Sequence, residues 1–169
     1  MPKPRPVETA LAQLAALKGM GPATLAAELP KYLANKSNIV VAKAADLARA
    51  AGVESLVPQL VAAFDRFMES PTKTDPTCAA KREIANALYE LGAPAQAVFL
   101  TGIRHVQKEA AWGPPVDTAA ELRGLCALGL VRMGYRDVMT ELADLLADGE
   151  GGGLGEGGVG VVEVLADEG

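Results

Sequence analysis

Residues 102–115 of the chain, GIRHVQKEAAWGPP, contain its only histidine and its only tryptophan. An imidazole can transfer protons near neutral pH, but catalysis needs a second group in reach, and the sequence supplies none for His105. The helical spacing over 94–109 instead predicts a small basic face with Arg104, His105 and Lys108, extended by Arg66 of the preceding segment. We therefore expect this face to bind an acidic segment of a partner protein.

Trp112 stands in a Gly-Pro-Pro loop directly after that predicted helix. An indole in this place can cover the end of the core and donate its N–H to a carbonyl. It can also be an exposed anchor, since Trp and Arg dominate binding energies at interfaces. For His105 and Trp112, packing is the favoured interpretation. The candidate partner-binding residues are Arg66, Arg104, His105, Lys108 and Trp112.

The chain offers little to a metal ion. One histidine and scattered carboxylates make a poor ligand set for iron or zinc, so the sequence predicts no metal site and no cofactor. Cys126 has the neighbours of a core residue, and Cys78 falls in the first turn of a predicted helix. At Cys78 packing is favoured over a reactive thiol, because no base accompanies it. We expect both thiols to be reduced, as in a cytoplasmic protein.

Composition points to an all-α fold. Of the 169 residues 50% are hydrophobic but only 4% are aromatic, so the core is aliphatic, and Ala and Leu favour helices. A net charge of -5 disfavours nucleic acid as a partner, since such binding depends on many basic groups. No apolar run is long enough for a signal peptide or a membrane span, so no membrane partner is expected.

One pattern recurs three times, at intervals of about 40 residues, and this repetition predicts stacked helical hairpins. Each copy is a helical segment that ends at a glycine and is followed at once by a second helical pattern. An alanine seven residues before each glycine indicates close approach of neighbouring helices. The copies are 37–52, 75–92 and 117–134, which end at Gly52, Gly92 and Gly134.

Each copy opens on a residue that can cap a helix, and a basic residue follows six positions later. Stacked repeats would bring these side chains into a row. The row can be a ladder that binds a ligand or a series of ion pairs between repeats, and the second interpretation is favoured because repeats need contacts with their neighbours. Ser37 caps the first copy, and the predicted inter-repeat residues are Lys43, Asp75, Lys81, Asp117 and Arg123.

The two ends of the chain depart from the pattern. Residues 1–36 predict an atypical N-terminal capping repeat, in which Pro30 breaks the second helix. Residues 149–169 are rich in glycine and predict a degenerate repeat or a mobile tail. If the tail leaves the apolar face of 135–147 open, we expect it to be covered by a partner protein, by a second copy through self-association at this C-terminal end, or by further chain.

The capped helix, the glycine and the second helix with a spaced leucine resemble the HEAT-like repeats of bacteria, including those named after phycobilisome lyases. The resemblance covers residues 37–148 and is carried by runs such as KTDPTCAAKREIANALYELG and DTAAELRGLCALGLVRMG. It implies an α-solenoid of stacked antiparallel helical hairpins, about four repeats over 1–148, with the second helices lining a concave side. HEAT-like enzymes such as deoxyhypusine hydroxylases rely on several His-Glu pairs, and this chain has no such dipeptide.

A non-catalytic scaffold or adaptor is therefore the expected function, with a segment of another protein bound on the concave face or at the C-terminal end. Two alternatives stay open. One is a lyase-like or chaperone-like role on a tetrapyrrole-type ligand, and the other is weak binding of nucleic acid.

Overall fold

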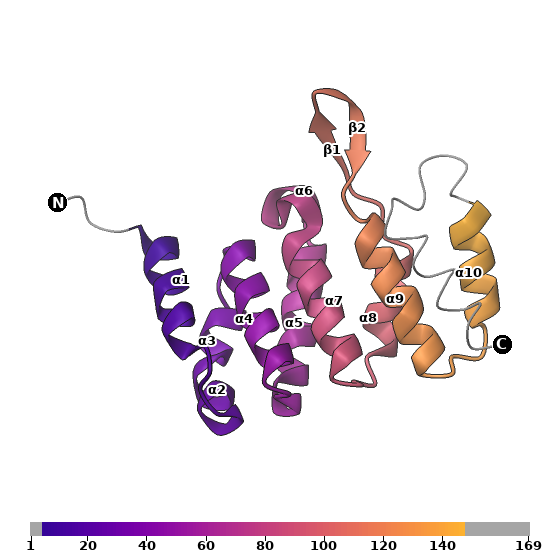
Figure 1. The fold of residues 1–169 in the computed structure, drawn as a ribbon. Helices are drawn as coiled ribbons and strands as arrows, with labels where there is room; N and C mark the ends of the chain where they lie inside the picture. Colours follow the sequence, from indigo (N-terminus) through magenta and orange to yellow (C-terminus); the bar gives the residue numbers. More distant parts are fainter. Residues whose placement is uncertain (1–4, 148–169) are drawn as a thin grey trace. The chain divides into compact units, whose positions relative to one another are not determined.

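The computed structural model describes residues 5–147, and these are mostly helical (Figure 1). The all-α class is therefore confirmed in its coarse form, with one β-hairpin as an exception. The chain forms two compact units, Met1–Ala93 and Pro94–Gly169. The tail 149–169, for which a degenerate repeat or mobile segment is expected, lies outside the described residues. Within 5–147 no helix is both long enough and apolar enough to cross a membrane.

The first unit is built from seven α-helices in its described part, with α4 and α7 packed along each other at its centre. Helix α1 packs on α4 (Figure 1). Helix α3 also contacts α4, and α5 packs on α7. The bounds are α1 Pro6–Leu17, α2 Pro22–Glu28, α3 Pro30–Leu33, α4 Asn38–Ala50, α5 Val57–Met68, α6 Pro71–Thr74 and α7 Ala79–Glu90. Short 3-10 turns precede two of them, η1 at Glu54–Leu56 and η2 at Pro76–Cys78.

Prolines set several of these helix starts. A proline occupies one of the first two positions of α1, α2, α3, α5 and α6, where its missing N–H leaves no intrahelical bond unmade. Pro30 separates α2 from α3, as the sequence predicts, because a proline inside a continuous helix would clash with the preceding turn.

The three predicted copies share one helix ending. Gly52, Gly92 and Gly134 follow α4, α7 and α9 (Ala120–Arg132) with φ of 65°, 63° and 63°, a left-handed conformation that glycine adopts without strain. After each glycine, the next N–H returns to a carbonyl five residues earlier, for example from Val53 to Ala48 at 2.9 Å. The alanines seven residues before the glycines, Ala45, Ala85 and Ala127, are all fully buried.

The helix starts differ from the prediction. Ser37 precedes α4 but makes no capping bond with its side chain. The next two helices begin at Ala79 and Ala120 rather than directly after Asp75 and Asp117. Before α7 the chain makes an extra turn, η2, and the Asp75 carboxylate reaches across it to the N–H groups of Ala80 and Lys81. A cap can thus act from beyond a turn that the sequence pattern does not reveal.

The second unit has helices α8 (Gln96–Ile103), α9 and α10 (Val138–Ala147), and strands β1 (Lys108–Ala111) and β2 (Gly113–Asp117). Helix α9 packs on α8 and on α10. The α8 contact is close, because a Cβ at position 129 would stand 2.8 Å from the ring of Phe99. The predicted helix over 94–109 is wrong in its second half. It ends at Ile103, and the chain turns into an antiparallel hairpin.

Candidate functional site

The five candidate residues do not share one helical face. Arg66 lies in the last turn of α5, where its guanidinium donates to the carbonyls of Leu33 and Asn35 at 2.8 and 3.1 Å. Leu33 is the last residue of α3 and Asn35 follows two residues later. The last carbonyls of a helix have no hydrogen-bond partner within that helix. Arg66 therefore links α5 to the end of α3, and its expected part in partner binding stays a prediction.

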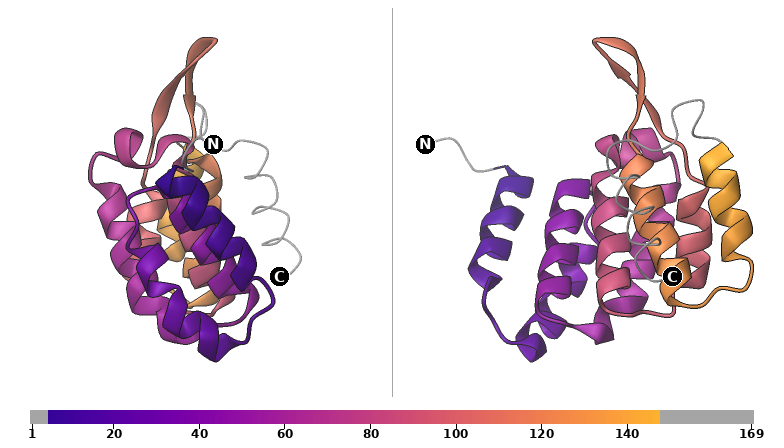
Figure 2. Two further views of the ribbon diagram at one scale, coloured as in Figure 1. Left: turned by 90° about the vertical axis from the view of Figure 1, so that its left-hand side faces the viewer. Right: turned by 45° about the vertical axis from the view of Figure 1, so that its right-hand side comes forward.

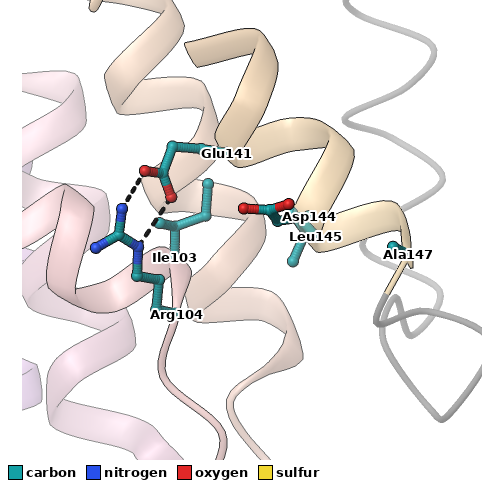
Figure 3. A pocket seen from close by; sticks show the side chains of 6 residues that line it. All are labelled: Ile103, Arg104, Glu141, Asp144, Leu145 and Ala147. Carbon is teal, nitrogen blue, oxygen red and sulfur yellow. Dashed lines mark hydrogen bonds and ion pairs between the residues drawn. The ribbon is translucent and has the colours of Figure 1, made fainter. Parts of the chain in front are cut away.

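Arg104 is the residue at which α8 ends, and it is committed to an ion pair. Its Nε donates to Glu141 Oε2 at 3.0 Å, and its Nη2 donates to the other oxygen of the same carboxylate (Figure 3). Glu141 is buried on α10 and raises the pKa of Arg104 further. The pair lines a pocket of about 300 Å³ together with Ile103, Asp144 and Leu145. Arg104 thus shares its charge with Glu141 while its side chain stays 65% exposed, and its expected part in a basic face stays a prediction.

Lys108 and Trp112 belong to the hairpin, and His105 lies in the loop between α8 and β1. In its register Lys108 pairs with Asp117 and Glu109 with Val116, with a β-bulge between Glu109 and Ala111. The hairpin extends away from α8 and α9 of its own unit (Figure 2). Trp112 is the residue between the two strands, and its relative exposure of 109% is the highest among the large hydrophobic residues described. The interpretation that the indole covers the core is therefore wrong.

The base of the hairpin is held by a dense polar network. Gln107, which is buried, donates its N–H to Asp117 Oδ1 at 3.1 Å, and its carbonyl accepts the N–H of Thr118 at 2.9 Å. Arg123 of α9 pairs with Asp117 Oδ2 at 2.7 Å and donates to the His105 carbonyl at 2.9 Å. The network thus ties both strand ends to α9 and fixes the direction in which the hairpin leaves the helices.

Both the ring and the backbone carbonyl of His105 lie in contact with neighbouring polar groups. Its Nε2 lies 3.1 Å from Gln107 Oε1, and its backbone carbonyl accepts from Arg123. In the described part of the chain, no group of three or more His, Cys, Asp or Glu residues is arranged for a metal ion. Cys78 and Cys126 are not joined in a disulfide, and both are buried. Cys78 is the last residue of the 3-10 turn η2 and precedes α7 in a left-handed conformation with φ of 57°, so it does not lie in the first turn of the α-helix.

The basic residues that follow the caps pair within their own segments, which corrects the prediction of ion pairs between repeats. Lys81 pairs with Asp75 at 2.9 Å, and both side chains are fully buried. Arg123 pairs with Asp117 in the same way, whereas Lys43 pairs with Asp46 of its own helix. A link between repeats does exist at Asp75, whose Oδ1 accepts from Asn38 Nδ2 of α4 at 3.0 Å. Asn38 is a residue that the sequence pattern does not single out.

The position of Asp117 at the hairpin base changes the pKa of its carboxyl group. Burial by itself would raise its pKa, but the Arg123 guanidinium and the N–H groups of Gln107 and Ala119 stabilise the carboxylate more strongly. The pKa of Asp117 is therefore lowered from its usual value of 3.8. A lowered pKa in the folded state means that the ionised form contributes to stability.

Acidification should weaken the hairpin base. The contribution of Asp117 is complete above the pKa of the unfolded carboxyl, about 3.9, and is lost as the pH falls through the lower pKa of the folded one. We expect the free energy of unfolding of the wild type to exceed that of Asp117→Asn at pH 7. The difference should shrink as the pH is lowered to about 3, as measured by urea unfolding at each pH. A difference that stays constant over this range would show that the Asp117 charge does not matter.

Three contributors to this region escape prediction from the sequence. Gln107, Thr118 and Glu141 have no motif around them, and Glu141 stands 37 residues from its partner Arg104. The Pro114-Pro115 dipeptide is the one local signal, because two prolines interrupt a helical pattern and suit an exposed strand edge.

Comparison with known proteins gives no match: no family model, no curated protein and no solved structure resembles the chain closely enough. Fold and site together define a mostly helical protein that carries a projecting hairpin with an exposed tryptophan at its tip.

Proposed function

We propose that the protein is a non-catalytic scaffold or adaptor that binds another protein through the tip of its β1–β2 hairpin. The observation that carries the proposal is the complete exposure of Trp112. Tryptophan is large and apolar, and it is among the residues that contribute most to binding when a partner buries them. The concave-face site expected from Arg66, Arg104 and Lys108 is replaced here by the hairpin.

The surroundings of Trp112 support a presented side chain. The network of Gln107, Asp117, Thr118 and Arg123 holds the hairpin base, so the tip is displayed from a fixed support. Such preorganisation lowers the entropy that binding has to remove. An exposed indole on an unsupported loop would not have this advantage.

A HEAT-like α-solenoid of about four repeats is the architecture we propose for residues 1–148. The shared glycine endings after α4, α7 and α9 and the buried alanines within these helices support it. A cytoplasmic location is part of the proposal, and two buried cysteines that form no disulfide are compatible with a reducing compartment.

Substituting Trp112→Ala in the full chain should abolish the capture of the partner while leaving the helices unchanged. A hot-spot residue contributes about 2 kcal/mol or more, which is roughly 30-fold in affinity. The measurement is a nuclease-treated pull-down from a lysate of the source cell, with wild type and variant as parallel baits and circular dichroism as the check on folding.

Met139→Ala is the matched control, because Met139 is an exposed apolar residue of the same unit, with a relative exposure of 74%, but lies on α10. It should capture the same protein as the wild type. Capture that survives Trp112→Ala would contradict the hairpin as the binding element. A visible absorbance change with a tetrapyrrole, or binding of nucleic acid that falls steeply with salt, would favour one of the alternative functions instead.

A further inference from the structure

Resting on the proposed function, we infer that the partner is a protein with an apolar pocket that receives the indole of Trp112 end-on. The backbone edges of the hairpin take no part in this contact. The sequence and geometry of the hairpin disfavour the other ways in which an exposed β-hairpin can bind, namely strand addition, pairing with a second copy and insertion into a lipid surface.

Strand addition is blocked on both edges. An added strand needs a row of free N–H and C=O groups, and proteins prevent it with short strands, prolines, bulges and edge lysines. Strand β2 carries Pro114 and Pro115, which have no N–H to donate. Strand β1 has only four residues and begins with Lys108, and its register with β2 shifts at Ala110, which stands opposite both Pro114 and Pro115.

The tip carries one large exposed side chain among small ones. Trp112 is flanked by the small residues Ala110, Ala111 and Gly113, all exposed, so the indole stands above its neighbours. A partner can therefore close around the ring without meeting other side chains. A pocket can bury the whole side chain, about 150–250 Å², whereas a flat surface would bury only part of it. Two copies that meet tip to tip would bury far less than the roughly 1,000 Å² that a stable interface needs. This size argues for a pocket, and against a second copy that offers the same small hairpin.

Charge on the hairpin argues against a lipid surface. Residues 106–117 contain one lysine, Lys108, and two acids, Glu109 and Asp117, so their net charge is +1 − 2 = −1. Anionic lipids attract clusters of basic residues, which this hairpin lacks. The pocket of the partner should combine apolar walls with an acceptor for the indole N–H, because a buried indole needs that hydrogen bond.

Trp112 is the only tryptophan of the chain, so its fluorescence reports directly on this contact. The experiment titrates the full chain with three probes. They are the purified protein whose capture depends on Trp112, vesicles of phosphatidylcholine and phosphatidylserine, and the chain itself at rising concentration. We expect a blue shift of the emission and protection from acrylamide with the captured protein only.

Two variants separate the pocket from strand addition. Ala110→Pro removes an N–H from β1 at the register shift and should leave the affinity unchanged, whereas Trp112→Phe should weaken it by roughly tenfold or more. Loss of binding in a folded Ala110→Pro variant, or binding without a blue shift, would overturn the pocket while the scaffold function stands. A blue shift with vesicles or on self-concentration would overturn it in favour of a membrane or a second copy. If no protein is captured at all, the proposed function fails as well.

Discussion

Lys81→Met should destabilise the protein by about 3–5 kcal/mol, because it leaves a buried carboxylate without its cation. Lys81 and Asp75 are both fully buried, and their ion pair at 2.9 Å lies inside the first unit. The chain reaches this arrangement through two left-handed residues, Thr77 and Cys78, with φ of 60° and 57°. Such conformations are costly for residues other than glycine, and the bonds made by Asp75 compensate for them. Urea unfolding followed by circular dichroism measures the loss.

Lys43→Met is the matched control, because Lys43 occupies the same position in the preceding copy of the pattern. Its pair with Asp46 is partly exposed, with side-chain exposures of 43% and 32%. Such pairs contribute about 0–1 kcal/mol. The double variant Asp75→Asn/Lys81→Met should recover part of the stability, since no unpaired charge stays buried. Equal losses in Lys81→Met and Lys43→Met would show that burial of the pair is not decisive.

Local features of the fold could be predicted because local physics decides them. A left-handed residue after a helix favours glycine, so Gly52, Gly92 and Gly134 mark the helix ends correctly. Pro30 separates two helices because its ring is incompatible with a continuous one. The repeat pattern also locates the fully buried alanines, such as Ala85.

The hairpin could not be predicted because distant residues decide it. Phe99, Ile103 and Val106 are spaced as on one helical face, and this favours a helix that runs past residue 104. In the structure Arg123 binds the carbonyl of His105 from 18 residues away, and Glu141 binds Arg104 from 37 residues away. These contacts stabilise the turn out of the helix, and neither can be found from local spacing. Val106 is accordingly exposed rather than packed.

The same limit applies to the row of basic residues. Their spacing from the capping positions is visible in the sequence, but the spacing fits a bond to the next repeat as well as one to the same segment. Only the position of each carboxylate decides between them. Asp75 and Asp117 both turn back toward their own helices, α7 and α9, and each pairs there with the basic residue that follows it.

Arg123→Met should loosen the hairpin and weaken capture of the partner at once. Arg123 is 5% exposed, and its loss removes the cation that pairs with the Asp117 carboxylate and the side-chain donor that binds the His105 carbonyl. We expect a destabilisation of about 3 kcal/mol, at the lower end for a buried pair, because Asp117 keeps the N–H groups of Gln107 and Ala119. Ordering a loosened base on binding costs on the order of 1–2 kcal/mol, so capture should weaken by roughly tenfold.

Hydrogen exchange at the N–H groups of Gln107 and Thr118 measures this loosening directly, because both are bonded across the hairpin base. Lys81→Met is the control here, since it breaks a comparable pair in the first unit and leaves the hairpin contacts in place. Faster exchange at the base in Arg123→Met but not in Lys81→Met would link the buried arginine to the display of Trp112. Unchanged exchange together with lost stability would mean that Arg123 holds α9 rather than the hairpin, and that Trp112 is positioned by the strands alone.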